Sequence, residues 1–388
     1  MAERAYFDWN ATAPLRAEAR AAMVAALDAS GNASSAHAEG RAARKLVEDA
    51  RAQVAGLVGA EARQVTFTSA ATEANALALQ PLFEGQRLFV SAVEHPSVRS
   101  GGRFTQNTEL AVNSDGVVDL DALQAALAGT ERPFVSVMLA NNETGVIQPI
   151  RPIADIVHAA GGLLHVDAVQ GPGRIECRFG DLGADMLSLS AHKLGGPQGA
   201  GALIRRADIH LQPLIRGGGQ ERGLRAGTEN VAAIAGFGAA AAAVAANWRS
   251  EAVHTAHLRQ RIEAGIRERC PQAVIFGEKA DRLPNTTLFA VPGLKAETAL
   301  IAFDLNGVAV SSGSACSSGK VQPSSVLAAM GVELELARSG LRVSTGWSTT
   351  DRDVEKLLDA LIKVSSSLLK AHENSGMNSG KSKSDLAA

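Results

Sequence analysis

The stretch that decides the fold is Ala184-Asp185-Met186-Leu187-Ser188-Leu189, followed directly by Ser190-Ala191-His192-Lys193. Its first part alternates in polarity and predicts a strand. Gly195-Gly196-Pro197 comes next and places Lys193 on a loop at the end of that strand. An earlier apolar run, Leu163-Leu164-His165-Val166, predicts another strand, which ends at Asp167. The pattern therefore predicts a lysine and a carboxylate at neighbouring strand ends.

This pair of side chains has two interpretations. Pyridoxal phosphate needs a lysine amine, which forms a Schiff base with its aldehyde, and an acid, which keeps its pyridine nitrogen protonated. A solvated loop lysine and an aspartate in a turn are the ordinary alternative. The pair alone does not decide between them, so the evidence must come from the rest of the chain.

Length and composition limit the class of protein. The 388 residues suffice for a large core and two domains, and 46% of them are apolar. A net charge of −2 offers no footprint for nucleic acid. Cys177, Cys270 and Cys316 are too scattered for a disulfide or zinc framework, which favours a reducing compartment.

Nothing in the chain predicts a membrane segment. The N-terminus has no apolar signal core. The longest uncharged run, 231–246, is shorter than the roughly 20 residues of a membrane span. We expect a buried or interface helix there, no membrane contact, and a cytoplasmic protein.

Five predicted strands each end in a polar loop and alternate with predicted helices at 15–27, 41–58 and from Ser69 onward. The strands lie at 65–68, 88–90, 134–139, 163–166 and 184–189. This order predicts an α/β fold with a mostly parallel, doubly wound sheet, whose ligands bind at the carboxyl ends of the strands. The residues at or just past these ends are Thr72, His95, Asn142, Asp167 and Lys193. Their common placement predicts a single site.

Three features near these ends keep an ordinary alternative. Ser69 and Thr72 open a helix, which suits a phosphate, although Ser and Thr are also common N-caps. His95 precedes Pro96 and is either structural or catalytic. The basic, glycine-rich run 217–228 is either a phosphate loop or a flexible linker.

The pattern changes from about residue 255. An amphipathic helix at 257–269 precedes two predicted antiparallel strands at 273–276 and 286–291. We expect an N-terminal arm at 1–14 that packs with the small domain, a large domain at 15–254, a small α+β domain at 255–373, and a disordered tail at 374–388. The last helix begins near Thr350, where Asp353 completes a near capping box.

Cys316 lies in an unusual setting. The segment 311–319 is made almost entirely of Ser, Gly and Ala, whereas a structural cysteine usually has bulky apolar neighbours. This context favours an accessible, reactive thiol, although a thiol with the reference pKa of about 8.5 is mostly protonated at pH 7.

Taken together, the motifs resemble the cysteine desulfurases, fold-type-I pyridoxal-phosphate enzymes of the class-V aminotransferase family. The matching segments are 68–75, 141–145, 165–170, 190–193, 217–228 and 311–319. Residues 225–230 resemble the nitrogen-fixation branch of that family. The resemblance covers the chain to about residue 365 and implies the same fold: a large domain with the doubly wound sheet and a smaller C-terminal domain that carries Cys316.

The resemblance also implies the roles of individual residues. Lys193 would attach the cofactor, Asp167 would pair with its pyridinium nitrogen, and Gln170 would contact its phenolic oxygen. His95 would stack on the ring and move protons. The phosphate would be held by Ala71, Thr72, Ser190 and His192, and by Thr228 from the other subunit of a homodimer. Asn142 and Arg342 would bind the substrate carboxylate, and Asn142 would also contact the cofactor.

The implied reaction converts L-cysteine to L-alanine and leaves a persulfide on Cys316. The sulfur would pass to an acceptor or iron–sulfur scaffold protein, with Cys316 transiently ligating a cluster iron and no resident metal. Alternatives are a selenocysteine lyase, another enzyme of this fold, or a non-catalytic scaffold. Ala70 and Trp9 depart from the pattern, since many relatives have Gly and Asn there. A positive φ at Ala70 would cost strain.

Overall fold

The computed structural model describes residues 4–313 and 323–381, with side chains up to residue 368. Its larger sheet has the strand order β2-β8-β7-β6-β5-β3-β4. The strands are β2 (Val65–Thr68), β3 (Leu88–Ser91), β4 (Asn107–Leu110), β5 (Phe134–Met138), β6 (Leu163–Asp167), β7 (Met186–Ser190) and β8 (Gly201–Arg205). β8 pairs antiparallel with β2 and β7, and the other neighbours are parallel. The predicted mostly parallel sheet is confirmed.

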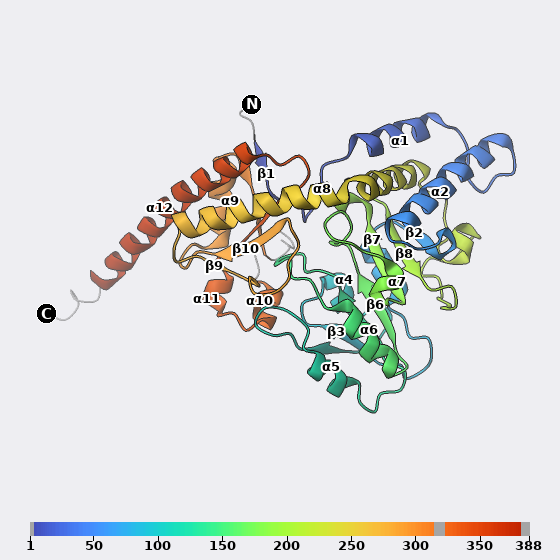
Figure 1. Cartoon of the computed structure of the whole chain (residues 1–388), viewed down its shortest axis with the longest axis horizontal. Coiled ribbons are helices and arrows are strands. Elements are labelled where there is room, and N and C mark those ends of the chain that lie inside the picture. Colours follow the sequence, from blue (N-terminus) through green and yellow to red (C-terminus); the bar gives the residue numbers. More distant parts are fainter. Residues whose placement is uncertain (1–3, 314–322, 382–388) are drawn as a thin grey trace.

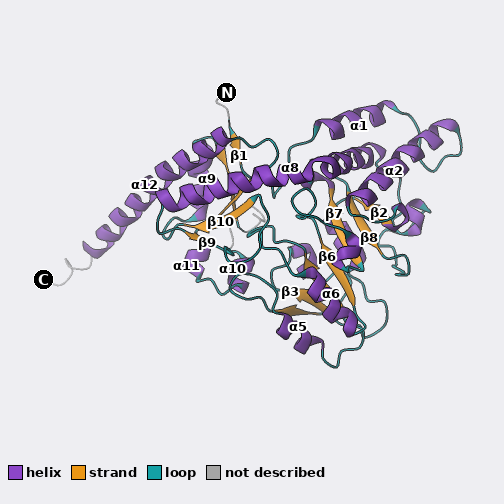
Figure 2. Cartoon of the chain, in the orientation of Figure 1, coloured by secondary structure: helices purple, strands orange, loops and turns teal. Residues whose placement is uncertain are grey.

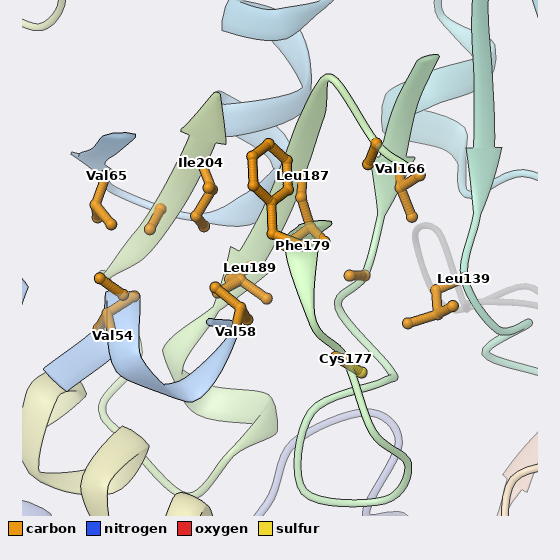
Figure 3. Close-up of a cluster of buried hydrophobic side chains, with 14 of the residues drawn as sticks. Val54, Val58, Val65, Leu139, Val166, Cys177, Phe179, Leu187, Leu189 and Ile204 are labelled. Carbon is orange, nitrogen blue, oxygen red and sulfur yellow. The ribbon is translucent and has the colours of Figure 1, made fainter. Parts of the chain in front are cut away.

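Helices cover both faces of this sheet (Figures 1 and 2). They are α1 (Ala17–Asp28), α2 (Ala38–Leu57), α3 (Ala71–Ala78), α4 (Pro96–Arg99), α5 (Leu120–Leu127), α6 (Ile150–Ala159), α7 (Phe179–Leu182) and the first part of α8 (Val231–Arg269). β5, β6 and β7 are almost wholly buried, because a parallel sheet is covered on both sides. Figure 3 shows part of the resulting core, where Cys177 packs among valines and leucines.

A second, four-stranded sheet forms the smaller unit. Its order is β12-β13-β10-β9, and all three pairs are antiparallel. The strands are β9 (Val274–Ile275), β10 (Thr286–Ala290), β12 (Ser311–Ser312) and β13 (Gly340–Ser344). The helices α9 (Ala296–Leu305), α10 (Ser325–Ala329), α11 (Leu334–Ala337) and α12 (Asp351–Lys381) accompany it. The antiparallel arrangement predicted for this part is confirmed.

The N-terminal arm pairs with the smaller unit. β1 (Ala5–Tyr6) lies parallel to β11 (Val308–Ala309). Phe7 is fully buried in the hydrophobic core of the smaller unit, which is the second core of the protein. The arm then passes to the larger sheet, where the Ala13 N–H donates to the carbonyl of His192. It therefore joins both units.

The prediction of two separate helices after residue 230 was wrong. The Ala-rich run and the amphipathic run form one helix, α8, which crosses the boundary expected at 255 and spans both units (Figure 1). No proline interrupts it, and its glycines allow close packing: a Cβ at Gly238 would lie 2.5 Å from the Ala50 Cα. By length and composition, α8 is also the one helix among the described residues that could span a membrane, and 56% of its most apolar stretch is buried in the protein.

The C-terminal helix begins as predicted. The Thr350 N–H and hydroxyl donate to Asp353, and the Asp353 N–H donates to the Thr350 hydroxyl. The apolar stripe of α12 packs into the second core through Val354, Leu357 and Leu361. The helix continues to Lys381 and so enters the tail that we expected to be disordered from 374; residues 382–388 lie outside the described part. The tail prediction relied on composition alone and did not allow for propagation of an established helix.

Candidate active site

Lys193 lies where β7 ends. The strand passes into a single turn, Ala191–Lys193, and the amine of Lys193 donates to the backbone carbonyls of Asn10, at 2.5 Å, and Ala11, at 2.7 Å. Both acceptors belong to the N-terminal arm. The arm therefore closes over the lysine at the carboxyl edge of the large sheet.

The surroundings of Lys193 favour the neutral amine. Burial lowers the pKa of Lys193 to about 7, and the positive charges of Arg342 and Arg174 add to this effect. The carboxylates of Asp8 and Asp167 act in the opposite direction. A substantial fraction of the amine is therefore unprotonated at neutral pH, which a nucleophile or base requires.

Asp167 lies at the end of β6, next to the Lys193 strand. Its carboxylate accepts a hydrogen bond from the Asn75 amide nitrogen at 2.8 Å and another from the Val169 N–H at 3.1 Å. The side chain is 6% exposed and forms no ion pair with Lys or Arg in the part of the chain that the structure describes. Its negative charge is thus buried with neutral donors, which suits a cationic ligand such as a pyridinium nitrogen.

His95 follows β3 at the same edge and caps α4. Its Nδ1 accepts from the Ser97 N–H at 3.2 Å and lies 2.8 Å from the Ser97 hydroxyl. Burial lowers the pKa of His95; Asp167 raises it and Lys193 lowers it. The imidazole is therefore neutral at pH 7, so it can stack on a ring or accept a proton.

Gln170 and His192 both contact the N-terminal arm. Gln170 donates its amide nitrogen to the Asn10 carbonyl at 3.0 Å, the same oxygen that Lys193 uses. His192 Nδ1 lies 3.2 Å from the Thr12 hydroxyl, and burial lowers the pKa of His192 to about 4. Both predicted site residues therefore lie close to Lys193 and contact the same N-terminal arm.

Arg342 approaches from the smaller unit. It lies on β13, donates to the Asn142 carbonyl at 2.9 Å and pairs with the Asp8 carboxylate at 2.6 Å. Its Nε is buried without a hydrogen-bond partner in the described structure. Asn142 follows β5, so this bond joins the two units. The unused donor and the planar fork of the guanidinium suit a substrate carboxylate.

The residues expected to hold a phosphate lie beside β8. Thr68 and Ser190 both pair with Gly201, so the ends of β2 and β7 flank it, and Ala71 and Thr72 open α3 next to them. The free N–H groups of a first helical turn suit an anion. Ala70 has φ −168°, an extended conformation without strain. The absence of Gly here therefore needs no compensation.

Thr228 lies on the surface next to the start of α3. It is exposed and lines a surface cavity together with Ser69, Arg225 and Gly199. Arg225 in turn pairs with Glu73 of α3 at 3.0 Å. The glycine-rich run 217–228 is thus attached to the helix α3 rather than free as a linker.

Cys316 lies outside the described residues, so its predicted place beside the site stays a prediction. The described residues on either side of its segment do approach the site. Ser324 donates to the Glu143 carboxylate at 2.5 Å, and a Cβ at Gly313 would lie 2.8 Å from the same carboxylate. Glu143 follows Asn142 directly, so both flanks of the cysteine segment meet next to a predicted substrate-binding residue.

Four residues around the site had no role in the sequence analysis: Asp8, Asn10, Asn75 and Arg174. Asn75 lies within a motif that was noted, one helical turn after Thr72. Asp8 and Asn10 belong to the arm, for which only packing was predicted. Trp9 between them packs edge-on against Trp347, with ring centroids 4.7 Å apart, and a Cβ at Gly346 would clash with it. Local pattern gave no signal for these long-range contacts.

Pyridoxal phosphate fits the residues present. A buried carboxylate without counter-charge, a lysine with a lowered pKa and a neutral histidine share one sheet edge beside a helix N-terminus. The side-chain oxygen of Asn75 and the Nε of Arg342 remain unpaired and buried there. No group of three or more His, Cys, Asp or Glu side chains suited to a metal occurs within residues 4–313 and 323–368.

A doubly wound sheet with Lys193 and Asp167 at the ends of adjacent strands defines a fold-type-I pyridoxal-phosphate enzyme. Comparison with known proteins agrees. The model of the family Aminotransferase class-V matches residues 5–357. A cysteine desulfurase of Cereibacter sphaeroides is 41% identical over 371 residues, which cover 92% of this chain and 95% of that protein. The chain therefore belongs to the class-V aminotransferase family, and within it to the cysteine desulfurases.

Solved structures show the same similarity. A NifS-like protein from Rickettsia africae has a TM-score of 0.87 and 38% identity, over 93% of this chain and 99% of that one. The structure of SspA in complex with cysteine has a TM-score of 0.77 and 29% identity, over 89% of this chain and all of that one. The fold and family expected from the sequence are thus confirmed.

Proposed function

We propose that this protein removes sulfur from L-cysteine, releases L-alanine and takes the sulfur on Cys316. The observation that carries the proposal is the convergence of Lys193, Asp167 and Arg342, which come from two sheets and can hold one amino acid substrate over one cofactor. Relatives named cysteine desulfurase support it, and one similar protein is described in complex with cysteine.

Each residue has a defined task. Pyridoxal phosphate, when bound, supplies the electron sink at the substrate Cα. Arg342 binds the substrate carboxylate beside Asn142, and Asp167 keeps the pyridine nitrogen protonated. The Lys193 amine, with its pKa lowered to about 7, accepts the Cα proton once substrate has displaced it from the cofactor. Neutral His95 is placed for ring stacking and proton transfer.

The sulfur step balances without an added oxidant or reductant. The Cys316 thiolate attacks the substrate sulfur, an S–S bond forms and the Cβ–S bond breaks. The electron pair of the broken bond stays with the substrate Cβ, which takes up a proton. The Lys193 ammonium returns a proton to Cα, and alanine is released. The persulfide on Cys316 then passes its outer sulfur to an acceptor thiol or an iron–sulfur scaffold protein, where Cys316 ligates cluster iron transiently.

The proposal includes a homodimer in which Thr228 serves the phosphate of the partner subunit. Its exposure on an ordered loop supports this role. A cytoplasmic location is also proposed, supported by Cys177 and Cys270, which are both free thiols as in a reducing compartment.

Mass spectrometry of the cofactor-loaded full chain after incubation with L-cysteine tests the function. We expect one added sulfur on the peptide that contains Cys316, and alanine in solution. Cys316→Ala removes the adduct and the sulfide released with a reductant, whereas Cys270→Ala, at a buried cysteine remote from the site, retains both. Sulfide release by Cys316→Ala at the parent rate would refute the persulfide mechanism.

A further inference from the structure

Arg174 differs from the other buried arginines. Arg16 pairs with Glu251, Arg51 with Glu221 and Arg342 with Asp8. Arg174 is 8% exposed and forms no ion pair with any carboxylate in residues 4–313 and 323–368. Its positive charge is therefore buried without a counter-charge, which is costly and unusual for a structural residue.

The acidic and thiol groups near Arg174 do not compensate it. Glu251 lines the same pocket as Arg174 but is bound by both Nη atoms of Arg16, at 2.8 and 2.6 Å. Burial raises the pKa of the Cys177 thiol, so this neighbour is neutral at pH 7. Burial and the charge of Arg342 lower the pKa of Arg174 to about 10, which still leaves the guanidinium protonated.

Within the described residues, the guanidinium of Arg174 makes two hydrogen bonds, both to Gln170. Its Nη1 donates to the Gln170 backbone carbonyl at 2.8 Å and to the side-chain oxygen at 2.7 Å. A left-handed Gly173, with φ +84°, turns the chain back so that this contact forms.

The contact decides how the Gln170 amide points. With its oxygen toward Arg174, its nitrogen donates to the Asn10 carbonyl, which also accepts from Lys193. If the amide were flipped, its nitrogen would face the Arg174 guanidinium, which is also a donor. Its oxygen would face the Asn10 carbonyl, which is also an acceptor. The orientation is therefore set from both sides.

We propose that Arg174 is a positioning residue for the reaction: it fixes the Gln170 amide with its nitrogen toward the cofactor side and sets an uncompensated positive charge beside the Lys193 amine. Arg174 and Lys193 line the same cavity, which places the charge near the amine. The proposal rests on the proposed function for what Lys193 does.

Other charged and titratable groups also act on Lys193, so Arg174 must be varied alone. The arm contributes Asp8, β6 contributes Asp167, β13 contributes Arg342, and the loops after β3 and β7 contribute His95 and His192. Arg174, unlike Asp167, Arg342, His95 and His192, binds neither substrate nor cofactor in the proposed function. Its replacement therefore reports on charge and orientation rather than on lost ligand contact.

The test compares Arg174→Met and Arg174→Gln, which remove the charge, with Arg174→Lys, which keeps it. Arg178→Met, at an exposed arginine on the same connection, is the matched control. Two quantities are measured on the full chain without cysteine. One is the pH midpoint of the visible absorption change of the cofactor-loaded protein. The other is the pH midpoint of Lys193 modification by an amine reagent after cofactor removal, followed by mass spectrometry.

Both midpoints are expected to rise by about one pH unit in the two neutral variants, since loss of a nearby positive charge favours the protonated nitrogen. Arg174→Lys and Arg178→Met keep the parent midpoints. Arg174→Gln retains a donor for Gln170, so it supplies the answer if Arg174→Met does not fold. Parent midpoints in Arg174→Gln, or an equal rise in Arg174→Lys, would overturn the charge effect.

The orientation of Gln170 is tested by kinetics. Arg174→Lys offers a single ammonium in place of the planar fork, so kcat is expected to fall several-fold with KM unchanged. An unchanged kcat would overturn this part. Because the midpoints are measured without substrate, they fail independently of persulfide formation on Cys316, so the two proposals are distinguishable.

Discussion

Asp167 and Arg342 face the site from different sheets, and the protein partners their charges differently. Asp167, at the edge of the large sheet, is held by the neutral donors Asn75 and Val169. Arg342, on β13 of the small sheet, is paired with the carboxylate of Asp8 and also bonds the Asn142 carbonyl. In the described structure, the Asp167 carboxylate thus has no cationic partner, whereas the Arg342 guanidinium is already paired with a carboxylate of the protein.

The difference indicates which ligand each side binds. A buried carboxylate with only neutral partners gains most from a permanent cation, so the large sheet suits a resident cofactor with a pyridinium nitrogen. An arginine that shares its fork with Asp8 gains less from a further anion and releases it more easily. The small sheet therefore suits a substrate carboxylate that must leave at each turnover.

Loss of Lys193 from the large-sheet edge should have the largest effect. Lys193→Ala removes the amine that accepts the Cα proton, and the rate of alanine formation should fall by at least about 10³-fold. The visible band of the attached cofactor should also be lost. Lys45→Ala, on the exposed face of α2, is the control and should keep both. Activity of Lys193→Ala within tenfold of the parent would rule out this lysine as the base.

The titration of Glu94 tests whether Asp167, among the described residues, is the only ionised carboxylate without a cationic partner at the edge of the large sheet. Burial raises the pKa of Glu94 to about 8 and the Asp167 charge adds to the rise, against hydrogen bonds from Ser91 and Met138. Because the folded pKa exceeds the ordinary value of 4.5, the stabilisation is complete below pH 4.5 and is lost as the pH rises through 8.

Glu94→Gln replaces the neutral acid by a neutral amide and removes this titration. Between these pH values, the unfolding free energy of the parent should fall relative to Glu94→Gln by roughly 1.36 kcal/mol per pH unit. Urea unfolding at several pH values measures both curves. Parallel curves would mean that Glu94 does not titrate between these pH values, so that the sheet edge carries a second negative charge besides Asp167.

Arg342→Lys examines the small-sheet side alone. An ammonium cannot bind both oxygens of a carboxylate, so KM for L-cysteine should rise about 10- to 100-fold. The visible spectrum of the loaded protein should not change, since Arg342 does not hold the cofactor. A shifted spectrum with an unchanged KM would reverse the assignment of the two sheets.

Asn75→Ala should give the smallest effect and the opposite signature. It removes the 2.8 Å donor to Asp167, and a loss of about tenfold in kcat is expected, equivalent to about 1.4 kcal/mol. The visible band should shift while KM for L-cysteine stays within twofold. Asn247→Ala, on α8 away from the site, is the control.

Much of the large sheet was predictable because its signals are local. β2 is at its predicted position, and β3, β5, β6 and β7 differ by one or two residues at their ends. A parallel sheet brings the carboxyl ends of its strands to one edge, so Lys193, Asp167 and His95 could be grouped from strand ends alone. The continuity of α8 was less predictable. The sequence predicted two helices there because the apolar pattern changes along the run, although the backbone stays helical throughout.

The sequence by itself determined the α/β class and, through its motifs, the family. Only the tertiary structure decided how the side chains of the site are partnered. The arm carbonyl of Asn10 binds Lys193, Asp8 pairs with Arg342, and Arg174 lies uncompensated against Gln170. Hydrogen bonds of this kind join residues up to 334 positions apart, and no local periodicity encodes them. For Lys193, the loop position follows from the residues around it, whereas its lowered pKa follows from burial and from the charges of Arg342 and Arg174, which only the fold places beside it.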